Sequence, residues 1–525
     1  MLERKAYAKL LDWKENGRKP LLVYGQRQTG KTFIIERFAK ENYSGYVYAD
    51  FSKDAEFRSV FEGQSLSIDR IILSIRTVRS LGSEDLSDTL FFFDEIQDCD
   101  AAFSALKLFA MDGRFKVIAS GSMLGIRING KEGSGDRRPL SPMGYVEPYV
   151  MRSMDFEEFL WSQGIPKESV SEVRRCIRSH VPIPDPIFGK FSDLFRAYMI
   201  VGGMPAAVEA FNENRESYVG AMSVQDSILA LVGQDINRYN SGMDLVKTLE
   251  CFESIPGQLS KTNKRFHYSD VGKAGTGSRK SADVYGGNLH WIKNAGYGNF
   301  VHGLNQISLP LTGQSKPDVF KVYMSDTGLL TRMYGDGAVI AIHSSDYSYN
   351  LGALTENVVA EGLVKCGFDV FYYQKNNGSG RMEVDFVIAV PSGAVAIEVK
   401  SGKKRESPSL SKVGEVFKLS ERVKLENGHS GVDKDGVIHM PLFAAAFMDS
   451  FEDRPPFLKR GRLEIAEDGR CWNGEHVDHW RRLRRVREMC KRLHTRTSRR
   501  RRRKGPRGGF PVPMLSVRPL RLDMP

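Results

Sequence analysis

The residues with the clearest chemistry lie in one short stretch, P-L-L-V-Y-G-Q-R-Q-T-G-K-T-F, which joins an apolar strand, a glycine loop and the start of a helix. Within it, residues 25–32 fit the pattern G-x-x-x-x-G-K-[ST]. In this pattern backbone N–H groups wrap a phosphate, the lysine adds a positive charge and the hydroxyl meets Mg²⁺. The two glycines permit positive φ and close approach of the ligand, and the helix directs its positive end at the same anion. The sequence therefore predicts a site for ATP and Mg²⁺ formed by Gly25, Gln26, Arg27, Gln28, Thr29, Gly30, Lys31 and Thr32.

Two acids follow a second apolar run, T-L-F-F-F-D-E. This run reads as a buried strand, and Asp94 at its carboxyl end can hold the water shell of Mg²⁺. Glu95 beside it can polarise an attacking water. A third run, Phe115 to Ala119, leads into Ser120, which either senses the γ-phosphate or forms a tight turn.

Three arginines occur in the glycine-rich stretch G-I-R-I-N-G-K-E-G-S-G-D-R-R-P, namely Arg127, Arg137 and Arg138. This composition predicts a loop. One of the three is a candidate arginine finger, but a solvated charged loop is the favoured interpretation, and the sequence does not choose among the three.

A second group of ionisable residues lies far from the phosphate loop. Residues 381–402 form two β-rich runs about a Pro-Ser-Gly tip, which predicts a hairpin. Glu398 and Lys400 are two residues apart on a strand and leave the same face. Asp385 joins them if the loop has an even number of residues, for example Ser392-Gly393, whereas a slip of one residue would separate them.

Converging carboxylates in this hairpin would suit a divalent metal. Asp385 and Glu398 could hold the ion, while Lys400 stabilises charge on a phosphate or helps to activate water. Glu356, near the start of the helical stretch G-A-L-T-E-N-V-V-A-E-G-L-V-K, is a candidate fourth acidic group. The alternative is a salt-bridged site without activity, since ionisable residues in an apolar hairpin must be paired or bound to metal.

The elements that position these residues predict an α/β protein of several parts. Alternating strands and helices indicate a doubly wound parallel sheet in residues 1–150, and helical periodicity indicates a lid or connector in 151–240. Two helical stretches followed by strand-like residues suit a winged helix-turn-helix in 241–320. Such folds bind DNA or serve as docking modules. Residues 321–450 carry the hairpin site and complete an α/β domain.

Composition sets the last 75 residues apart. From residue 451 onward there are 22 Lys and Arg against 9 Asp and Glu, whereas the preceding residues carry 54 and 55. This predicts a basic, disordered tail, which would ordinarily suggest a phosphate-binding arm. The abrupt shift from Lys to Arg and the loss of apolar periodicity favour instead an extension read in an unintended frame. Six widely spaced cysteines without a C-x-x-C pair indicate reduced thiols, and no run reaches the roughly 18 apolar residues of a membrane helix. We therefore expect a cytoplasmic protein without a membrane segment.

Several motifs together resemble one known group. They are G-Q-R-Q-T-G-K-T, F-F-F-D-E-I-Q, I-A-S-G-S-M-L-G, D-F-E-E-F-L, V-G-G-M-P, F-K-V-Y-M-S-D-T-G-L-L, T-E-N and E-V-D-F-V-I with I-E-V-K-S-G. Over about residues 1–450 the chain resembles bacterial and archaeal AAA-type P-loop ATPases fused to a C-terminal region with a PD-(D/E)XK nuclease-like, restriction-endonuclease-like fold. The resemblance implies Lys31, Thr32, Asp94 and Glu95 at the nucleotide, and Glu356, Asp385, Glu398 and Lys400 at a nuclease-like site.

Two functions from different classes follow. In the first, an ATP-hydrolysing switch gates a nuclease-like, DNA-binding C-terminal domain. In the second, the chain is a non-nucleolytic, ATP-dependent regulatory or interaction protein with a protein partner. Both are compatible with an oligomer.

Overall fold

The structure is a computed structural model that describes residues 2–62, 67–82, 85–123, 144–240, 242–272, 281–346, 351–375, 382–401 and 408–451. The chain divides into two units, Met1–Asp453 and Arg454–Pro525, and every described residue belongs to the first. The basic tail expected from residue 451, apart from that residue itself, lies outside the described residues, as do Arg127, Arg137 and Arg138.

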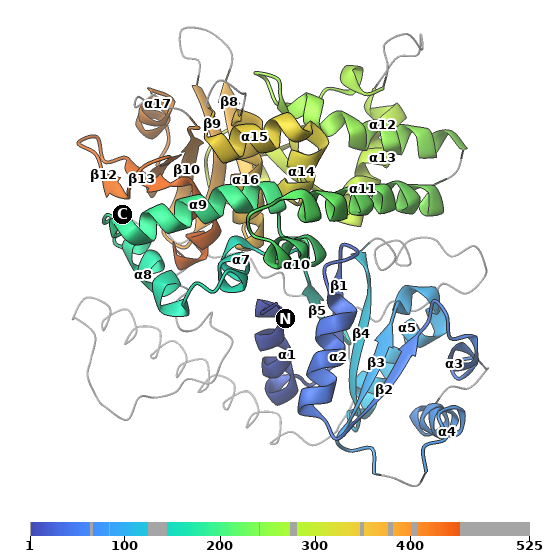
Figure 1. The fold of residues 1–525 in the computed structure, drawn as a ribbon. Coiled ribbons are helices and arrows are strands. Elements are labelled where there is room, and N and C mark those ends of the chain that lie inside the picture. The colour runs from blue at the N-terminus through green and yellow to red at the C-terminus, as the bar shows by residue number, and fades with distance from the viewer. Residues whose placement is uncertain are drawn as a thin grey trace, which may run out of the picture. The chain divides into compact units, whose positions relative to one another are not determined.

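Five parallel strands form the first sheet, in the order β2-β3-β4-β1-β5 (Figure 1). Their bounds are β1 Leu21–Gly25, β2 Gly45–Asp50, β3 Thr89–Asp94, β4 Lys116–Ser122 and β5 Glu147–Val150. The three expected apolar runs are β1, β3 and β4, and they are neighbours at the centre of the sheet. The prediction of an α/β fold with a parallel sheet is therefore confirmed. Because parallel strands end at one edge, the phosphate loop, the two acids and Ser120 are delivered to the same place.

Helices cover both faces of this sheet because alternate residues of its strands point to opposite sides. In β3, Leu90 and Phe92 pack with α1 and α2, whereas Phe91 and Phe93 pack with α4 and α5. Figure 1 shows the two helix layers on either side of the strands. The helices are α1 Lys5–Asn16, α2 Lys31–Asn42, α3 Ala55–Ser59, α4 Ile68–Val78, η1 Ile96–Asp98 and α5 Asp100–Asp112.

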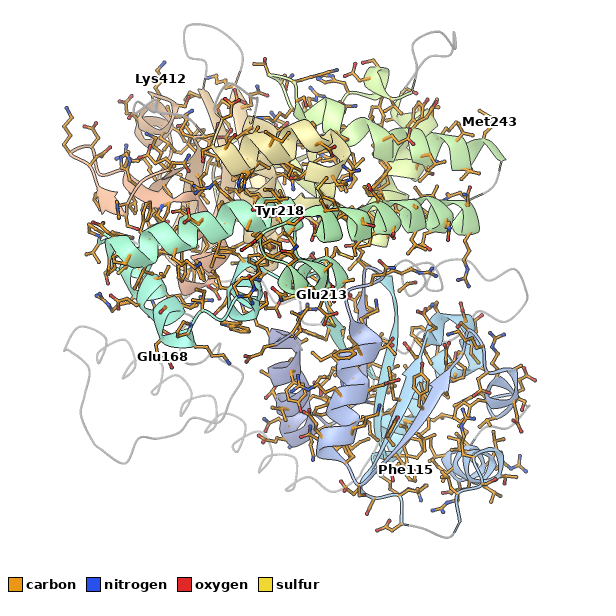
Figure 2. All side chains as sticks on the ribbon, viewed as in Figure 1. Phe115, Glu168, Glu213, Tyr218, Met243 and Lys412 are labelled. Atoms are coloured by element: carbon orange, nitrogen blue, oxygen red, sulfur yellow. The ribbon has the colours of Figure 1, made fainter. Side chains whose placement is uncertain are left out.

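A helical region follows β5. Its bounds are α7 Phe156–Ser162, α8 Lys167–Arg178, α9 Asp185–Val201, α10 Pro205–Glu213, α11 Val219–Tyr239, α12 Gly242–Leu259, η2 Tyr268–Asp270 and α13 Ala282–Ala295. Asp155 and Glu158 begin α7 with reciprocal side-chain-to-backbone hydrogen bonds, a capping box. The break at V-G-G-M-P separates α9 from α10. Glu213 ends α10 and Tyr218 precedes α11 (Figure 2).

A mixed sheet of eight strands forms the rest of the unit, in the order β12-β13-β11-β10-β9-β8-β6-β7. The strands are β6 Gly298–Leu304, β7 Ser315–Met324, β8 Phe371–Lys375, β9 Met382–Val390, β10 Gly393–Val399, β11 Glu421–Glu426, β12 Gly431–Val432 and β13 Ile438–Pro441. The associated helices are η3 Leu311–Gln314, α14 Thr327–Tyr334, α15 Asp336–Ser344, α16 Gly352–Lys365, α17 Pro408–Val416 and η4 Leu442–Phe451. Every residue of α16 from Ala353 to Leu363 is buried, which makes it the central helix of this region.

A separate winged-helix module is not confirmed. Two helices, α12 and α13, do precede the β6–β7 hairpin, as expected. However, β6 also pairs in parallel with β8, so the hairpin belongs to the same sheet as the strands of the predicted nuclease-like domain. The expected boundary between residues 320 and 321 falls inside β7.

Among the described residues, none of the helices is by itself long and apolar enough to cross a bilayer. One bent pair, α9 and α10, reaches that length and composition only when both helices are taken together, with a bend of 120° between them.

Candidate nucleotide site and a buried charge cluster

The phosphate loop connects the end of β1 to the start of α2. Gly30 precedes the helix with φ +85°, and Gln28 also has a positive φ of +61°. These conformations turn the chain tightly enough to present successive N–H groups to one anion. Lys31 is buried, and its Nζ donates to the carbonyl oxygens of Gly25 at 3.2 Å and Gln26 at 2.8 Å. Burial lowers the pKa of Lys31 to about 8, although Glu95 and Asp94 favour its charged form.

Gly25 is required by packing as well as by ligand approach. A Cβ at this position would lie 2.0 Å from the carbonyl oxygen of Met151, just beyond β5. Real Cβ atoms do not approach a backbone oxygen so closely, so any larger residue at position 25 would push the phosphate loop away from the segment that follows β5. At Gly30, by contrast, the nearest heavy atom would be 3.8 Å away, and only the positive φ demands glycine.

Asp94 collects the other predicted nucleotide-site residues. Its Oδ2 accepts a hydrogen bond from Thr32 Oγ1 at 2.8 Å, and its Oδ1 accepts from Ser120 Oγ and from the Glu95 backbone N–H. The structure therefore brings Thr32, Asp94 and Ser120 into direct contact. Hydroxyl and carboxylate oxygens are the ligands that Mg²⁺ prefers, so Thr32 and Asp94 fit the expected ion.

Glu95 lies next to this group with an unusual backbone. Its φ is +48°, which is uncommon for a residue with a side chain, and such conformations cluster at functional sites. Its carboxylate accepts a hydrogen bond from the side-chain amide of Gln97. This contact orients the carboxylate that we expect to polarise water.

Tyr48 on β2 is a site residue that the sequence did not reveal. Its hydroxyl donates to Asp94 Oδ2 at 3.3 Å. Burial, reinforced by Asp94, raises the pKa of Tyr48, so its hydroxyl remains a donor at neutral pH. Because β2 was not among the expected strands, nothing in the sequence placed this side chain at the edge of the sheet.

A pocket of about 440 Å³ opens beside the phosphate loop, and α11 forms one of its walls. The wall combines apolar and charged side chains: Ile228, Leu231, Val232, Asp235 and Arg238. The opposite side includes Gln26, Arg27, Gln28, Thr32, Tyr48, Asp50, Ser52, Lys53, Asp94, Glu95 and Asp98. Helix α11 is therefore the part of the predicted lid or connector, residues 151–240, that lines this pocket.

An ion pair at this pocket joins the phosphate loop to α11. Arg27 Nη1 lies 2.6 Å from Asp235 Oδ1, and Asp235 Oδ2 accepts a hydrogen bond from Tyr297 at 3.0 Å. Burial raises the pKa of Asp235, while Arg27 opposes that shift. Arg238, one turn further along α11, approaches Asp98 at 3.5 Å. Loop residue Arg27 is therefore held by the lid helix.

The second group of predicted site residues does share one region, but its hairpin differs from the expected one in detail. Gly393 pairs with Val390 and Ile397 with Phe386, so the two-residue loop is Pro391-Ser392 rather than Ser392-Gly393. The even loop length keeps Asp385 on the face of Glu398, as required. Continuing the register by one residue sets Asp385 opposite Glu398, not opposite Lys400, because the turn begins one residue earlier than the example assumed.

The carboxylates of this group are matched by lysines. Glu356 on α16 accepts hydrogen bonds from Lys264 Nζ and, at 3.1 Å, from the hydroxyl of Tyr323 on β7. Lys321 Nζ lies 3.9 Å from the same carboxylate. Lys400 pairs with Glu398, whose Oε2 is buried without a hydrogen-bond partner. Lys264 and Lys321 were not foreseen.

These partners bear directly on the expected metal. Burial would raise the pKa of Glu356, but Lys321 and Lys264 hold it below its ordinary value. Burial, together with Glu356, raises the pKa of Asp385 to about 7. Within the described ranges, no group of three or more His, Cys, Asp or Glu side chains is arranged to hold a metal ion. The set Glu356, Asp385 and Glu398 therefore does not fit a divalent cation in this arrangement.

A buried polar network joins α16 to the chain that leaves the nucleotide domain. Lys365 Nζ contacts Ser153 Oγ and the Met154 carbonyl oxygen, both at 2.8 Å, and Glu361 Oε1 at 2.6 Å. Glu361 also accepts hydrogen bonds from the backbone and hydroxyl of Thr327 and from Tyr198. Asn357 of the T-E-N motif also donates to Thr327 Oγ1 at 2.9 Å, so the T-E-N and D-T-G-L-L motifs meet in the core.

Arg4 makes a similar connection at the phosphate loop itself. Its guanidinium donates to the carbonyl oxygens of Thr29 at 2.9 Å and Arg152 at 2.7 Å, and to Glu158 on α7 at 3.1 Å. One buried side chain therefore ties the loop to the chain after β5 and to the first helix of the lid region.

Comparison with known families assigns the N-terminal part most clearly. Residues 17–160 match the family described as an AAA domain. Residues 192–339 and 351–443 match two families that are each described as a domain of unknown function, DUF8612 and DUF4143. No curated protein matches the chain. A nuclease-like identity for the C-terminal region is not confirmed.

Three solved structures are similar in part. The Walker-type ATPase PABY2304 of Pyrococcus abyssi is 14% identical, with a TM-score of 0.38, over 64% of this chain and 96% of its own. AMPPCP-bound DnaA from Aquifex aeolicus is 15% identical, with a TM-score of 0.22, over 55% and 87%. A signal-transduction ATPase with a tetratricopeptide repeat sensor from Pyrococcus horikoshii is 13% identical, with a TM-score of 0.24, over 69% and 48%. At these TM-scores the likenesses carry no weight for function.

Proposed function

We propose that this chain, whose N-terminal domain is an AAA-type P-loop ATPase domain, is an ATP-binding and ATP-hydrolysing switch that acts on its own C-terminal domain. The observation that carries the proposal is the contact between Thr32 and Asp94 directly beneath a phosphate loop whose lysine is buried and in place. Thr32 lies in the first turn of α2 and Asp94 ends β3, and they meet where a nucleotide phosphate and its cation would be bound.

Each residue has a role that follows from its position. The N–H groups of residues 26–31 and the ammonium of Lys31 bind the phosphates, and Thr32 with Asp94 would hold Mg²⁺, which neutralises phosphate charge. Glu95 accepts a hydrogen bond from the attacking water and thereby orients it. Ser120 fixes Asp94 and faces the terminal phosphate. Arg27 exchanges its bond to Asp235 for the phosphate, which gives α11 a way to respond to ATP.

The buried networks at Arg4 and Lys365 support coupling to the C-terminal domain. Arg4 donates a hydrogen bond to the carbonyl oxygen of Thr29 in the phosphate loop. Lys365 donates hydrogen bonds to Ser153 and Met154, which are next to residues that contact the same loop. A shift of the loop would be transmitted because buried polar groups cannot lose partners cheaply. Helix α16 carries both Lys365 and Glu356, so it is the element that links the two sites.

Two outputs remain as proposals. The first is a nuclease-like, DNA-contacting C-terminal domain with Asp385, Glu398 and Lys400 at its site. The second is a non-nucleolytic regulatory or interaction protein with a protein partner, and the ion pairs that occupy Glu356 favour this one. An oligomer is compatible with both.

The ATPase proposal is tested by measuring ATP turnover for wild type, Lys31→Ala and Asp94→Asn. We expect a loss on the order of 100-fold or more in kcat for each, because each removes a preorganised group at the developing charge. Lys40→Ala is the matched control, since Lys40 lies on the same helix with an exposed side chain. Turnover at the wild-type rate in Lys31→Ala would refute the assignment.

The outputs are separated by DNA binding and cleavage assays with Mg²⁺ or Mn²⁺, in ATP and in ADP. Cleavage that disappears in Lys400→Ala would support the nuclease output. ATP-dependent capture of a protein partner without cleavage would support the second. The salt concentration must be varied, because the basic tail alone predicts nucleic-acid binding that weakens steeply with ionic strength.

A further inference from the structure

Lys264 is an unexpected component of the hairpin site. It lies between α12 and α13, far in sequence from the acid that it contacts, and it donates to Glu356 Oε1. Both side chains are largely buried, with 15% of Lys264 and 11% of Glu356 exposed. An ammonium is brought into such a place only if the fold holds it there, because burying a charge is costly unless it is paired.

The segment that carries Lys264 is anchored by the two residues Phe266 and His267 that follow it. Phe266 N donates to the Phe320 carbonyl oxygen at 2.8 Å, so the segment adds to the outer edge of β7, and the two phenyl rings stack at 5.9 Å. Gln258 exchanges two hydrogen bonds with the backbone of His267, at 2.9 and 3.0 Å. These contacts leave the Lys264 side chain aimed at Glu356 and not at solvent.

A second lysine approaches from the sheet. Lys321 on β7 is almost completely buried, stands 3.9 Å from Glu356 Oε2 and lies 4.9 Å above the ring of Tyr372. Together with Lys400, the cluster holds three ammonium groups against the three carboxylates Glu356, Asp385 and Glu398. When all three acids are ionised, the formal charges balance without any bound ion. Because the pKa of Asp385 is raised to about 7, this acid is partly protonated at neutral pH, and a divalent cation would add still more uncompensated positive charge to a buried site.

We infer that Lys264 and Lys321 are built-in counter-ions that take the place of a divalent metal at this site, so that the wild-type chain holds no metal there. Lys264 is the replaceable one, because it lies in the segment after α12 with 15% of its side chain exposed, whereas Lys321 is part of β7 with 3% exposed. Without its ammonium, Glu356 Oε1 loses its cation while Oε2 keeps Tyr323 and Lys321, and the three carboxylates outnumber the two remaining ammonium groups, which is the condition for a divalent ion to bind. The inference concerns this site alone and does not depend on ATP hydrolysis.

The test is Mn²⁺ binding to the nucleotide-free, full-length protein, followed through the electron paramagnetic resonance signal of free Mn²⁺. Wild type and Lys264→Arg should show no Mn²⁺ that depends on Glu356. Lys264→Met should bind one additional equivalent, at least tenfold more tightly than wild type, and adding Glu356→Gln should abolish the gain. Mn²⁺ held by the phosphate loop is common to all variants. Lys261→Met, in the same segment but paired with Asp270 at the surface, should gain nothing.

Two outcomes would overturn the inference. One is wild-type Mn²⁺ binding that Glu356→Gln or Asp385→Asn removes, and the other is a folded Lys264→Met variant without added Mn²⁺ affinity. If Lys264→Met does not fold alone, thermal unfolding replaces the titration. Glu356→Gln should lower the melting temperature because it strands two buried ammonium groups, and adding Lys264→Met should restore part of the loss. A double variant that melts below Glu356→Gln would likewise refute the counter-ion role.

Discussion

Lys365→Met is the substitution that tests most directly how the nucleotide domain is joined to α16. Lys365 Nζ has four neighbours: Ser153 Oγ, the Met154 carbonyl oxygen, the Tyr198 hydroxyl and Glu361 Oε1. Methionine keeps much of the stem and removes only the ammonium. The variant therefore leaves Glu361, of whose side chain 1% is exposed, without its cation.

The magnitude follows from what Glu361 retains. Removing one partner of a buried ion pair costs about 3–5 kcal/mol. Glu361 still accepts hydrogen bonds from Thr327 and Tyr198, which stabilise its charge, so we expect the lower end, about 3 kcal/mol. For cooperative unfolding of the whole unit Met1–Asp453, with an unfolding entropy of about 2.1 cal/mol/K per residue, this corresponds to a decrease in Tm of about 3 °C.

Thermal unfolding of the full chain measures this effect, with Lys190→Met as the control because Lys190 is exposed on α9. Adding Glu361→Gln to Lys365→Met should recover part of the stability, since no unpaired buried charge then remains. Equal melting temperatures for Lys365→Met and Lys190→Met would show that the network does not hold the two parts together. A double variant that melts below Lys365→Met would contradict the electrostatic reasoning.

Three further predictions concern the nucleotide site. Because the pKa of Lys31 is lowered to about 8, its ammonium is lost as pH rises through 8. ATP affinity, measured by calorimetry, should therefore fall by up to about tenfold per pH unit between pH 8 and 10. An affinity that does not change over this range would contradict the prediction. Gly25→Ala should lower both Tm and ATP affinity, by about 1–3 kcal/mol in stability, because its Cβ would strike the Met151 carbonyl oxygen, whereas Gly233→Ala on α11 has open space and should not destabilise. Tyr48→Phe should lower ATP turnover by no more than about tenfold, since Asp94 keeps its bonds to Thr32 and Ser120, and a loss as large as that of Asp94→Asn would refute this ranking.

The hairpin site could be predicted only in part from the sequence pattern. The two-residue period of a strand places Glu398 and Asp385 on one face only if the loop has an even number of residues, and the structure supplies such a loop. The same reasoning could not select the turn, because Pro391-Ser392 and Ser392-Gly393 satisfy the period equally. Nor could it supply Lys321 or Lys264, which arrive from β7 and from the segment after α12.

The order of the elements predicted a separate winged-helix module, which the structure does not confirm. The order of two helices and a hairpin was read correctly, but order along the chain does not say what a hairpin pairs with. β8 follows α14, α15 and α16 in the sequence and pairs with the edge of β6 that β7 leaves open. This pairing makes the β6–β7 hairpin part of the larger sheet.

The sequence by itself determined the phosphate loop, the acids at the end of β3 and the parallel sheet that brings them to one edge. The loop and the strand end depend on neighbouring residues, because a glycine loop, a strand and a helix start are local structures whose geometry is set by a few consecutive φ and ψ angles. The parallel sheet was predicted from the alternation of strands and helices, since a strand that follows a crossover helix pairs in parallel. The tertiary structure alone decided that α11 closes the pocket through Asp235, that Tyr48 reaches Asp94 and that Lys264 meets Glu356. Those contacts join residues from separate elements, and long-range packing, not local propensity, sets which side chains meet.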